Sequence, residues 1–411
     1  MIAAKPLSEL LTTLLERPSF GWKATASNDI RDGCMRLLAE RAETSGLQLA
    51  AKIFGEYDTL GDDAKRAFFE FLNEDLDIDA DAVVRLANEY RVTPSPETYE
   101  ALAKASEPAR QRLFRRMNEA PGATAAIVRM RQDLRGLLPD QPHLARTDHD
   151  LLHLLRSWFN RGFLVMQQIS WDSPATILEK IIAYEAVHEI QNWDDLRRRL
   201  QPEDRRCFAF FHPSMPTEPL IFVEVALTKG VPNSVQTLLA ETDETLMETE
   251  ADTAVFYSIS NCQPGLAGVS FGSSLIKQVA RDLSRDLPNL KTFVTLSPLP
   301  GFMAWLKAEG ADTDISDGEH LVKLAAKYLL TAKDKHGRAL DPVARFHLGN
   351  GAQVHALHKD ADTSERGTHL SGGVMVNYLY DLNRISQRAT QFSKKGTVAA
   401  SSEVKALVRR A

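Results

Sequence analysis

A serine that could take part in chemistry stands directly after an apolar segment. Residues 292–296, Thr-Phe-Val-Thr-Leu, carry the β-branched and aromatic side chains typical of a strand, and Ser297 follows them. Pro298 and Pro300 come next, and proline fixes the backbone dihedral φ. We therefore expect the Ser297 hydroxyl to be held at a strand end, where it can donate or accept a hydrogen bond.

A glycine-rich segment lies upstream of this serine. Residues 265–272, Gly-Leu-Ala-Gly-Val-Ser-Phe-Gly, follow a predicted strand at 254–259 and precede a predicted amphipathic helix. The apolar face of that helix would consist of Leu275, Ile276, Val279, Ala280 and Leu283. Backbone N–H groups approach an anion closely at glycine, and a helix N-terminus favours negative charge. The pattern predicts a phosphate or pyrophosphate site, although such loops are also common as simple turns.

Other motifs fit this loop less well. Residues 268–272 match the G-x-S-x-G nucleophile elbow, but the predicted strand ends about ten residues too early, which favours Ser270 as an ordinary loop residue. The segment lacks the Gly-Lys-Ser/Thr ending of a P-loop and the G-x-G-x-x-G spacing of a dinucleotide site. The order strand, loop, helix, strand predicts parallel neighbours, so Ser297 and the loop would share one cleft at the carboxyl ends of the strands.

His347 is the other reactive candidate. It lies in residues 342–348, which we interpret as a strand, and Gly-Asn-Gly follows at 349–351. A functional histidine and a buried structural one both fit this position. Four more polar residues, His355, His358, Asp360 and Asp362, could imitate a metal site. Because helical ligand spacing such as H-E-x-x-H is missing, we expect them to be solvent-facing, and we predict no metal.

The elements around these residues suggest two domains. Helical periodicity recurs at 64–72, 96–105 and 107–117, and a proline-containing linker at 138–143 places the boundary near 140–155. We assign residues 1–150 to a helical domain. Residues 151–411 mix helices with strands. The helices are expected at 151–163 and 177–188, a β-hairpin at 207–211 and 220–225, and further strands at 254–259, 292–296, 343–348 and 373–378.

Composition limits the functional classes. The chain has 411 residues, 44% of them hydrophobic, and a net charge of −6, which suits about two globular domains and argues against a nucleic-acid or anionic-membrane partner. The three cysteines, Cys34, Cys207 and Cys262, lie far apart and form no C-x-x-C pair. No apolar run approaches the roughly 18 residues of a membrane span. We therefore expect a cytoplasmic protein.

Several segments between Leu151 and Tyr380 form a distinctive set. They are Tyr-Glu-Ala-Val-His at 184–188, Arg-Arg-Cys at 205–207, Glu-Pro-Leu at 218–220, Phe-Tyr-Ser-Ile-Ser at 256–260, Leu-Ser-Pro-Leu-Pro-Gly-Phe at 296–302, Phe-His-Leu-x-Asn-Gly-Ala at 346–352 and Asn-Tyr-x-Tyr at 377–380. Together these segments resemble the malonyl-CoA decarboxylase family.

The resemblance implies a fold and a site. It implies an all-helical N-terminal domain used in self-association to a homo-oligomer, then an α+β catalytic domain similar to GNAT acetyltransferases, in which CoA lies between two splayed parallel strands. Ser297 and His347 would be the catalytic pair, with Ser258 and Tyr380 nearby. The CoA pyrophosphate would bind the loop Ala267, Gly268, Val269, Ser270, Phe271, Gly272 and Ser273. Some family members have an acidic residue where this chain has Ser270, so no acid–base role is carried over for it.

The implied reaction converts malonyl-CoA to acetyl-CoA and CO2 through a thioester enolate that is protonated at carbon. The thioester carbonyl is the electron sink, so the resemblance implies neither a metal nor an organic cofactor. Two other functions would use the same CoA cleft: a GNAT-type acyltransferase, which needs an acceptor amine, and a non-catalytic acyl-CoA sensor.

Overall fold

The computed structural model describes residues 29–240, 245–269, 271–310 and 317–409, which form two compact units. The first unit contains the described residues up to Val165, together with the short segments 212–216 and 263–269. The second contains the remaining described residues. Within the described ranges, no helix is both long and apolar enough to span a membrane.

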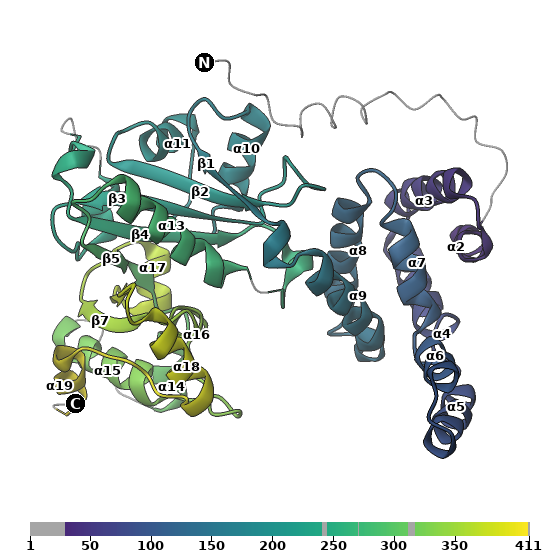
Figure 1. The fold of residues 1–411 in the computed structure, drawn as a ribbon. Helices are drawn as coiled ribbons and strands as arrows, with labels where there is room; N and C mark the ends of the chain where they lie inside the picture. Colours follow the sequence, from purple (N-terminus) through teal and green to yellow (C-terminus); the bar gives the residue numbers. More distant parts are fainter. Residues whose placement is uncertain (1–28, 241–244, 270, 311–316, 410–411) are drawn as a thin grey trace. The chain divides into compact units, whose positions relative to one another are not determined.

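The first unit is helical, as the sequence predicts (Figure 1). Its helices are α2 (Ile30–Ala39), α3 (Glu43–Asp58), α4 (Asp62–Glu74), α5 (Ala80–Val92), α6 (Pro96–Ala105), α7 (Ala109–Met117), α8 (Ala123–Leu137) and α9 (Ala145–Trp158). The predicted bounds of α6 are confirmed, because Ser95 caps the helix in a capping box with Thr98 and Pro96 occupies its first turn. The core of the unit includes Phe68 and Phe114, both buried.

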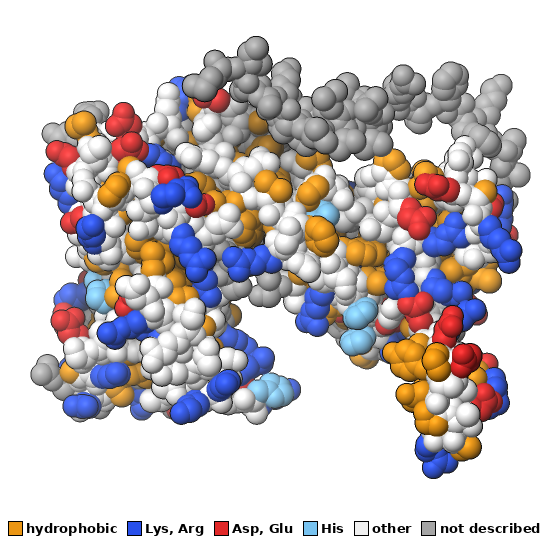
Figure 2. Space-filling view, viewed as in Figure 1, with side chains coloured by type: hydrophobic (Ala, Val, Ile, Leu, Met, Phe, Trp, Pro, Cys, Tyr) orange, Lys and Arg blue, Asp and Glu red, His pale blue; other side chains and the backbone are white. Residues whose placement is uncertain are grey.

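Helices α5 and α6 pack on each other but carry no buried residue. Val84, Val92 and Tyr99 are among the most exposed large hydrophobic side chains of the described residues. Figure 2 shows hydrophobic side chains gathered over these two helices. This α5–α6 hairpin therefore presents an apolar surface to solvent.

The second unit is built on one eight-stranded sheet of described residues, which confirms the mixed fold class. The strands are β1 (Val165–Ile169), β2 (Arg205–Phe211), β3 (Ile221–Thr228), β4 (Thr253–Asn261), β5 (Thr292–Thr295), β6 (Ser297–Pro298), β7 (Gln353–His358) and β8 (Met375–Leu379). Their order is β1-β2-β3-β4-β5-β8-β6, and β7 pairs with β8. The predicted hairpin is confirmed as the antiparallel β2–β3 pair, and β4 and β5 are parallel, as expected.

The described residues of the second unit also form helices, which pack on the strands and on one another (Figure 1). They are α10 (Ala175–Tyr184), α11 (Trp193–Leu200), α12 (Val235–Leu239), α13 (Gly272–Asp286), α14 (Phe302–Ala308), α15 (Gly318–Thr331), α16 (Pro342–Gly349), α17 (Glu365–Ser371), α18 (Ile385–Lys395) and α19 (Ser402–Arg409). Helices α10 and α11 pack on alternate residues of β2, among them Cys207 and Ala209. The predicted apolar face of α13 is buried.

One predicted strand is wrong. Residues 343–348 form part of helix α16, not a strand. The side chain of Asp341 accepts hydrogen bonds from the backbone N–H groups of Val343 and Ala344, both at 2.9 Å, and Pro342 occupies the first turn. An aspartate cap followed by proline starts a helix, and this local signal outweighs the strand-like composition of the segment.

Strands β4 and β5 separate where Ser297 stands. They pair in parallel from Thr253 with Thr292 to Phe256 with Thr295. After that point β4 continues beside β3, whereas Ser297 begins β6 and pairs with Val376 of β8. A bulge at Tyr257 accompanies the separation, because its neighbours Phe256 and Ser258 have partners in β3 and Tyr257 has none there. The sheet therefore opens between β4 and β6.

Candidate active site

A cavity of about 360 Å³ lies in the opening between β4 and β6. All of its lining residues belong to the second unit. They are Val187, Phe256, Tyr257, Ile259, Asn261, Ser297, Pro298, Pro342, Val343, Phe346 and His347. The pocket thus contains both residues that the sequence singled out for chemistry.

Ser297 and His347 are in contact. The Ser297 hydroxyl donates to the Thr295 Oγ1 at 2.9 Å and lies 3.3 Å from the His347 Nε2. On the other side of the ring, the His347 Nδ1 is 2.7 Å from the Tyr380 hydroxyl. These contacts are satisfied together when Tyr380 donates to Nδ1 and Nε2–H donates to the serine oxygen. The result is a buried chain from Tyr380 through His347 and Ser297 to Thr295.

The imidazole of His347 is held by aromatic rings. The Tyr378 ring stacks on it at a centroid distance of 4.5 Å, and Phe346 meets it edge-on. Only 2% of the His347 surface is exposed, and this burial lowers the pKa of the imidazole to about 3. Burial also raises the pKa of the Tyr380 hydroxyl. The pocket therefore holds a neutral histidine beside a protonated tyrosine at neutral pH.

The side chain of Asp341 connects the segment after Ser297 with helix α16, which carries His347. One carboxylate oxygen caps α16, and the other accepts from the Gly301 N–H at 3.3 Å and from the Tyr328 hydroxyl at 3.2 Å. A side chain on Gly301 would place its Cβ only 2.4 Å from the Tyr328 hydroxyl oxygen, so glycine is required there. Asp341 is buried, and burial raises the pKa of its carboxyl group. This residue sets the spacing between the two candidate catalytic side chains.

Ser258, which the resemblance implies to lie near the catalytic pair, contacts the side chain of Glu185. Its hydroxyl lies 2.7 Å from both carboxylate oxygens of Glu185, and within the described part of the chain no hydrogen bond joins it to Ser297 or His347. Its neighbours Tyr257 and Ile259 line the pocket instead. The structure thus brings Ser297, His347 and Tyr380 together, and places Ser258 in a separate polar cluster.

The structure describes only part of the predicted pyrophosphate loop, residues 267–273. Ala267, Gly268 and Val269 belong to the first unit, where Arg131 donates to the Ala267 carbonyl at 2.9 Å. The N–H groups of Ala267 and Val269 already donate to carbonyls within the loop, whereas Gly268 adopts a φ of +86°, which favours glycine. Ser270 lies outside the described residues. Phe271 is buried, and Gly272 and Ser273 begin α13, where their side chains are not described.

The expectation of solvent-facing polar residues at 355–362 is wrong in part. His355 and His358 belong to β7 and are half-buried, and His358 contacts the Asn377 side chain. Asp362 is buried and accepts from the Gln236 side chain at 3.0 Å. Asp360, in contrast, is exposed. Pairing of β7 with β8 buries this segment, and the sequence pattern did not predict β7.

Thr295, Asp341 and Glu185 were missed as residues of the site. The Asp341-Pro342 pair carried a readable signal, because it is a helix start. Thr295 lies in the predicted strand, but its contact with Ser297 depends on the change of pairing from β5 to β6. Nothing in the sequence around Glu185 indicates its partners, which are more than 70 residues away in β4.

Comparison with known proteins gives one consistent family. The model of the malonyl-CoA decarboxylase C-terminal domain matches residues 162–320 and 312–411, and the model of the N-terminal domain matches residues 76–159. Among curated proteins, the mitochondrial malonyl-CoA decarboxylase of Anser anser anser is 36% identical over 349 residues, covering 72% of this chain and 68% of that protein. The rat enzyme is 35% identical over 347 residues, covering 72% and 70%.

Solved structures agree with this. The malonyl-CoA decarboxylase of Rhodopseudomonas palustris is 45% identical, with a TM-score of 0.87, and the match covers 93% of this chain and 100% of that one. The enzyme of Cupriavidus metallidurans is 34% identical, with a TM-score of 0.73, and covers 92% and 98%.

Proposed function

The chain belongs to the malonyl-CoA decarboxylase family, and we propose that its conversion of malonyl-CoA to acetyl-CoA and CO2 takes place in the pocket between β4 and β6. The observation that carries this proposal is the contact between Ser297 and His347 in that pocket. The reaction breaks a carbon–carbon bond, so we class the protein as a carboxy-lyase.

Loss of CO2 leaves its electron pair on the α-carbon as a thioester enolate, which then takes up a proton. The Ser297 hydroxyl forms a hydrogen bond with the malonyl group. This bond either orients the departing carboxylate or stabilises the developing enolate oxygen. His347 delivers the proton to carbon from Nε2, and the Tyr380 hydroxyl, which donates to Nδ1, supports this transfer.

The lining of the pocket supports this chemistry. Its described lining residues include seven apolar or proline side chains in addition to the polar groups, and no lysine or arginine. A malonyl carboxylate that enters such a pocket loses hydration without gaining a cationic partner. This destabilises the localised charge of the carboxylate relative to the transition state, in which the charge spreads onto the thioester enolate, and so favours decarboxylation.

We also propose that residues 267–273 hold the CoA pyrophosphate. The first turn of α13 supports this proposal, because a helix N-terminus favours negative charge. For the compartment we propose the cytoplasm, since the three cysteines are free and buried.

Incubation of the purified protein with malonyl-CoA alone tests the proposed function. We expect acetyl-CoA and CO2 in equal amounts without any acceptor. Formation of an acyl product only when an amine is added would indicate an acyltransferase instead. Tight binding of malonyl-CoA without CO2 release would indicate a sensor. Either result would reject the proposal.

We propose that the helical domain, residues 1–150, mediates self-association, and that residues 151–411 carry catalysis. The exposed apolar residues of the α5–α6 hairpin support this assignment. Replacing Val92, which is 76% exposed, with glutamate should convert the oligomer to a smaller species, measured as molar mass by light scattering. Met247→Glu, at another exposed hydrophobic residue, is the matched control. An unchanged mass for Val92→Glu would exclude this hairpin as the interface.

A further inference from the structure

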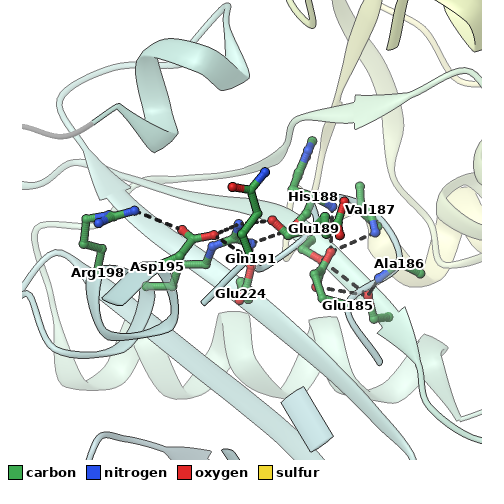
Figure 3. Close-up of polar contacts among 12 residues, drawn as sticks. Glu185, Ala186, Val187, His188, Glu189, Gln191, Asp195, Arg198 and Glu224 are labelled. Carbon is green, nitrogen blue, oxygen red and sulfur yellow. Dashed lines mark hydrogen bonds and ion pairs between the residues drawn. The ribbon is translucent and has the colours of Figure 1, made fainter. Parts of the chain in front are cut away.

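A single carboxylate organises the segment that follows α10. Helix α10 ends at Tyr184, and the side chain of Glu185 turns back to accept from the N–H groups of Val187 and His188, both at 2.8 Å. The same carboxylate accepts from two hydroxyls of β4, Ser258 at 2.7 Å and Ser260 at 3.2 Å. In Figure 3, Glu185 lies beside Ala186, Val187 and His188, and dashed lines mark its contacts. Glu185 thus joins the segment to β4.

The carbonyl groups of the same segment also have a charged partner. Arg199 of α11 donates to the carbonyl oxygens of His188 at 2.8 Å and Glu189 at 3.0 Å. The guanidinium is itself paired with the fully buried Glu224 at 3.2 Å. Residues 185–189 are therefore held through their N–H groups on one side and through their C=O groups on the other. Removal of one partner would leave buried polar groups unsatisfied.

This segment forms part of the pocket. Val187 lines the cavity that contains Ser297 and His347, and its N–H is one of the donors to Glu185. On β4, Ser258 and Ser260 flank Ile259, which also lines the cavity. The Glu185 carboxylate therefore connects two walls of the pocket, although Glu185 itself is not among the lining residues.

We propose that Glu185 is a positioning residue, which holds the Val187 wall against β4 at the width that the acyl-CoA substrate requires. This inference rests on the proposed function of the pocket. Ser258 then acts through Glu185 and not on the reacting atoms. Because an apolar wall contacts the substrate equally before and during the reaction, its displacement weakens binding and leaves the chemical step almost unchanged.

The test is the steady-state kinetics of Glu185→Gln on malonyl-CoA. The amide cannot accept from four donors at once, so we expect KM to rise about tenfold while turnover stays within about threefold of the wild type. Glu189→Gln is the matched control, because it makes the same change at an exposed glutamate of the same segment and should alter neither constant. Wild-type turnover, measured first, tests the proposed function separately.

A double-mutant cycle shows whether Glu185 acts through Val187. Val187→Ala alone should raise KM, and the double variant with Glu185→Gln should be less impaired than the product of the two single effects. The proposal would be overturned if the effects of the two substitutions on KM simply multiplied in the double variant. It would also be overturned if Glu185→Gln left KM unchanged, or if it lowered turnover a hundredfold at constant KM. If Glu185→Gln does not fold, Ser258→Ala replaces it, and an unchanged KM in the folded Ser258→Ala protein would likewise overturn the proposal.

Discussion

Replacing Ser297 with alanine, or His347 with glutamine, should lower the turnover of malonyl-CoA by about a hundredfold or more. A hydrogen-bond donor aimed at charge that develops in the transition state is typically worth about 3 to 4 kcal/mol, and a positioned proton donor is worth a similar factor. KM should change much less, because most of the binding surface of CoA lies away from these two side chains. Turnover numbers from the release of CO2 at saturating substrate provide the measurement.

Two exposed residues of the same types serve as controls. Ser386→Ala and His336→Gln make the same chemical changes on the surface and should leave turnover unaltered. The variant that combines Ser297→Ala with His347→Gln should be little slower than the worse single variant, since the two side chains contact each other and act on one substrate group. Turnover within a few-fold of the wild type in both single variants would reject the assignment.

The contribution of Asp341 differs from that of the catalytic pair. Asp341 is not among the residues that line the pocket, but its carboxylate caps the helix that carries His347 and accepts from the N–H of Gly301, which follows the Ser297 segment. The geometry of the pair therefore depends on a buried carboxylate with four donors. A small displacement of a catalytic group lowers the rate steeply, so the pair needs such a fixed support.

Local patterns predicted much of the fold. The capped helix α6 and the strands around Ser297 follow from propensity and turn residues close in sequence. The segment around His347 was misjudged because its β-branched and aromatic residues favour a strand, while the decisive Asp341-Pro342 start lies just before it. The position of His347 just before a glycine-rich turn nevertheless singled it out, and His347 lines the pocket.

Contacts that depend on the sheet could not be predicted in this way. Tyr380 reaches the His347 ring only because β8 pairs beside β5 and β6, which no local signal in the sequence specifies. The bulge at Tyr257 and the separation of β4 from β6 are likewise properties of strand pairing. The resemblance to a family supplied Tyr380, whereas the anchoring role of Glu185 became visible only from its partners in space.

The buried state of His347 should make the stability of the protein depend on pH. In the unfolded chain the imidazole has a pKa near 6.5, and burial lowers it to about 3 in the folded protein. Above pH 6.5 the ring is neutral in both states, and stability is complete. As pH falls from 6.5 toward 3, the unfolded chain binds a proton that the folded protein excludes, so the free energy of unfolding decreases.

This decrease amounts to about 1.4 kcal/mol per pH unit, or about 2 kcal/mol between pH 6.5 and pH 5. Urea unfolding of the wild type and of His347→Gln at pH 5, 6, 7 and 8 isolates it, because every other titrating group is common to both proteins. That includes Glu224, whose pKa burial raises to about 8. The free energy of unfolding of the wild type minus that of His347→Gln should be constant from pH 8 to pH 7. At pH 5 this difference should be about 2 kcal/mol smaller, because only the wild type is destabilised by protonation of His347 in the unfolded chain. A constant difference across the whole range would mean that His347 accepts a proton in the folded protein as easily as in water. Such an imidazole would not be the neutral proton donor that the pocket requires.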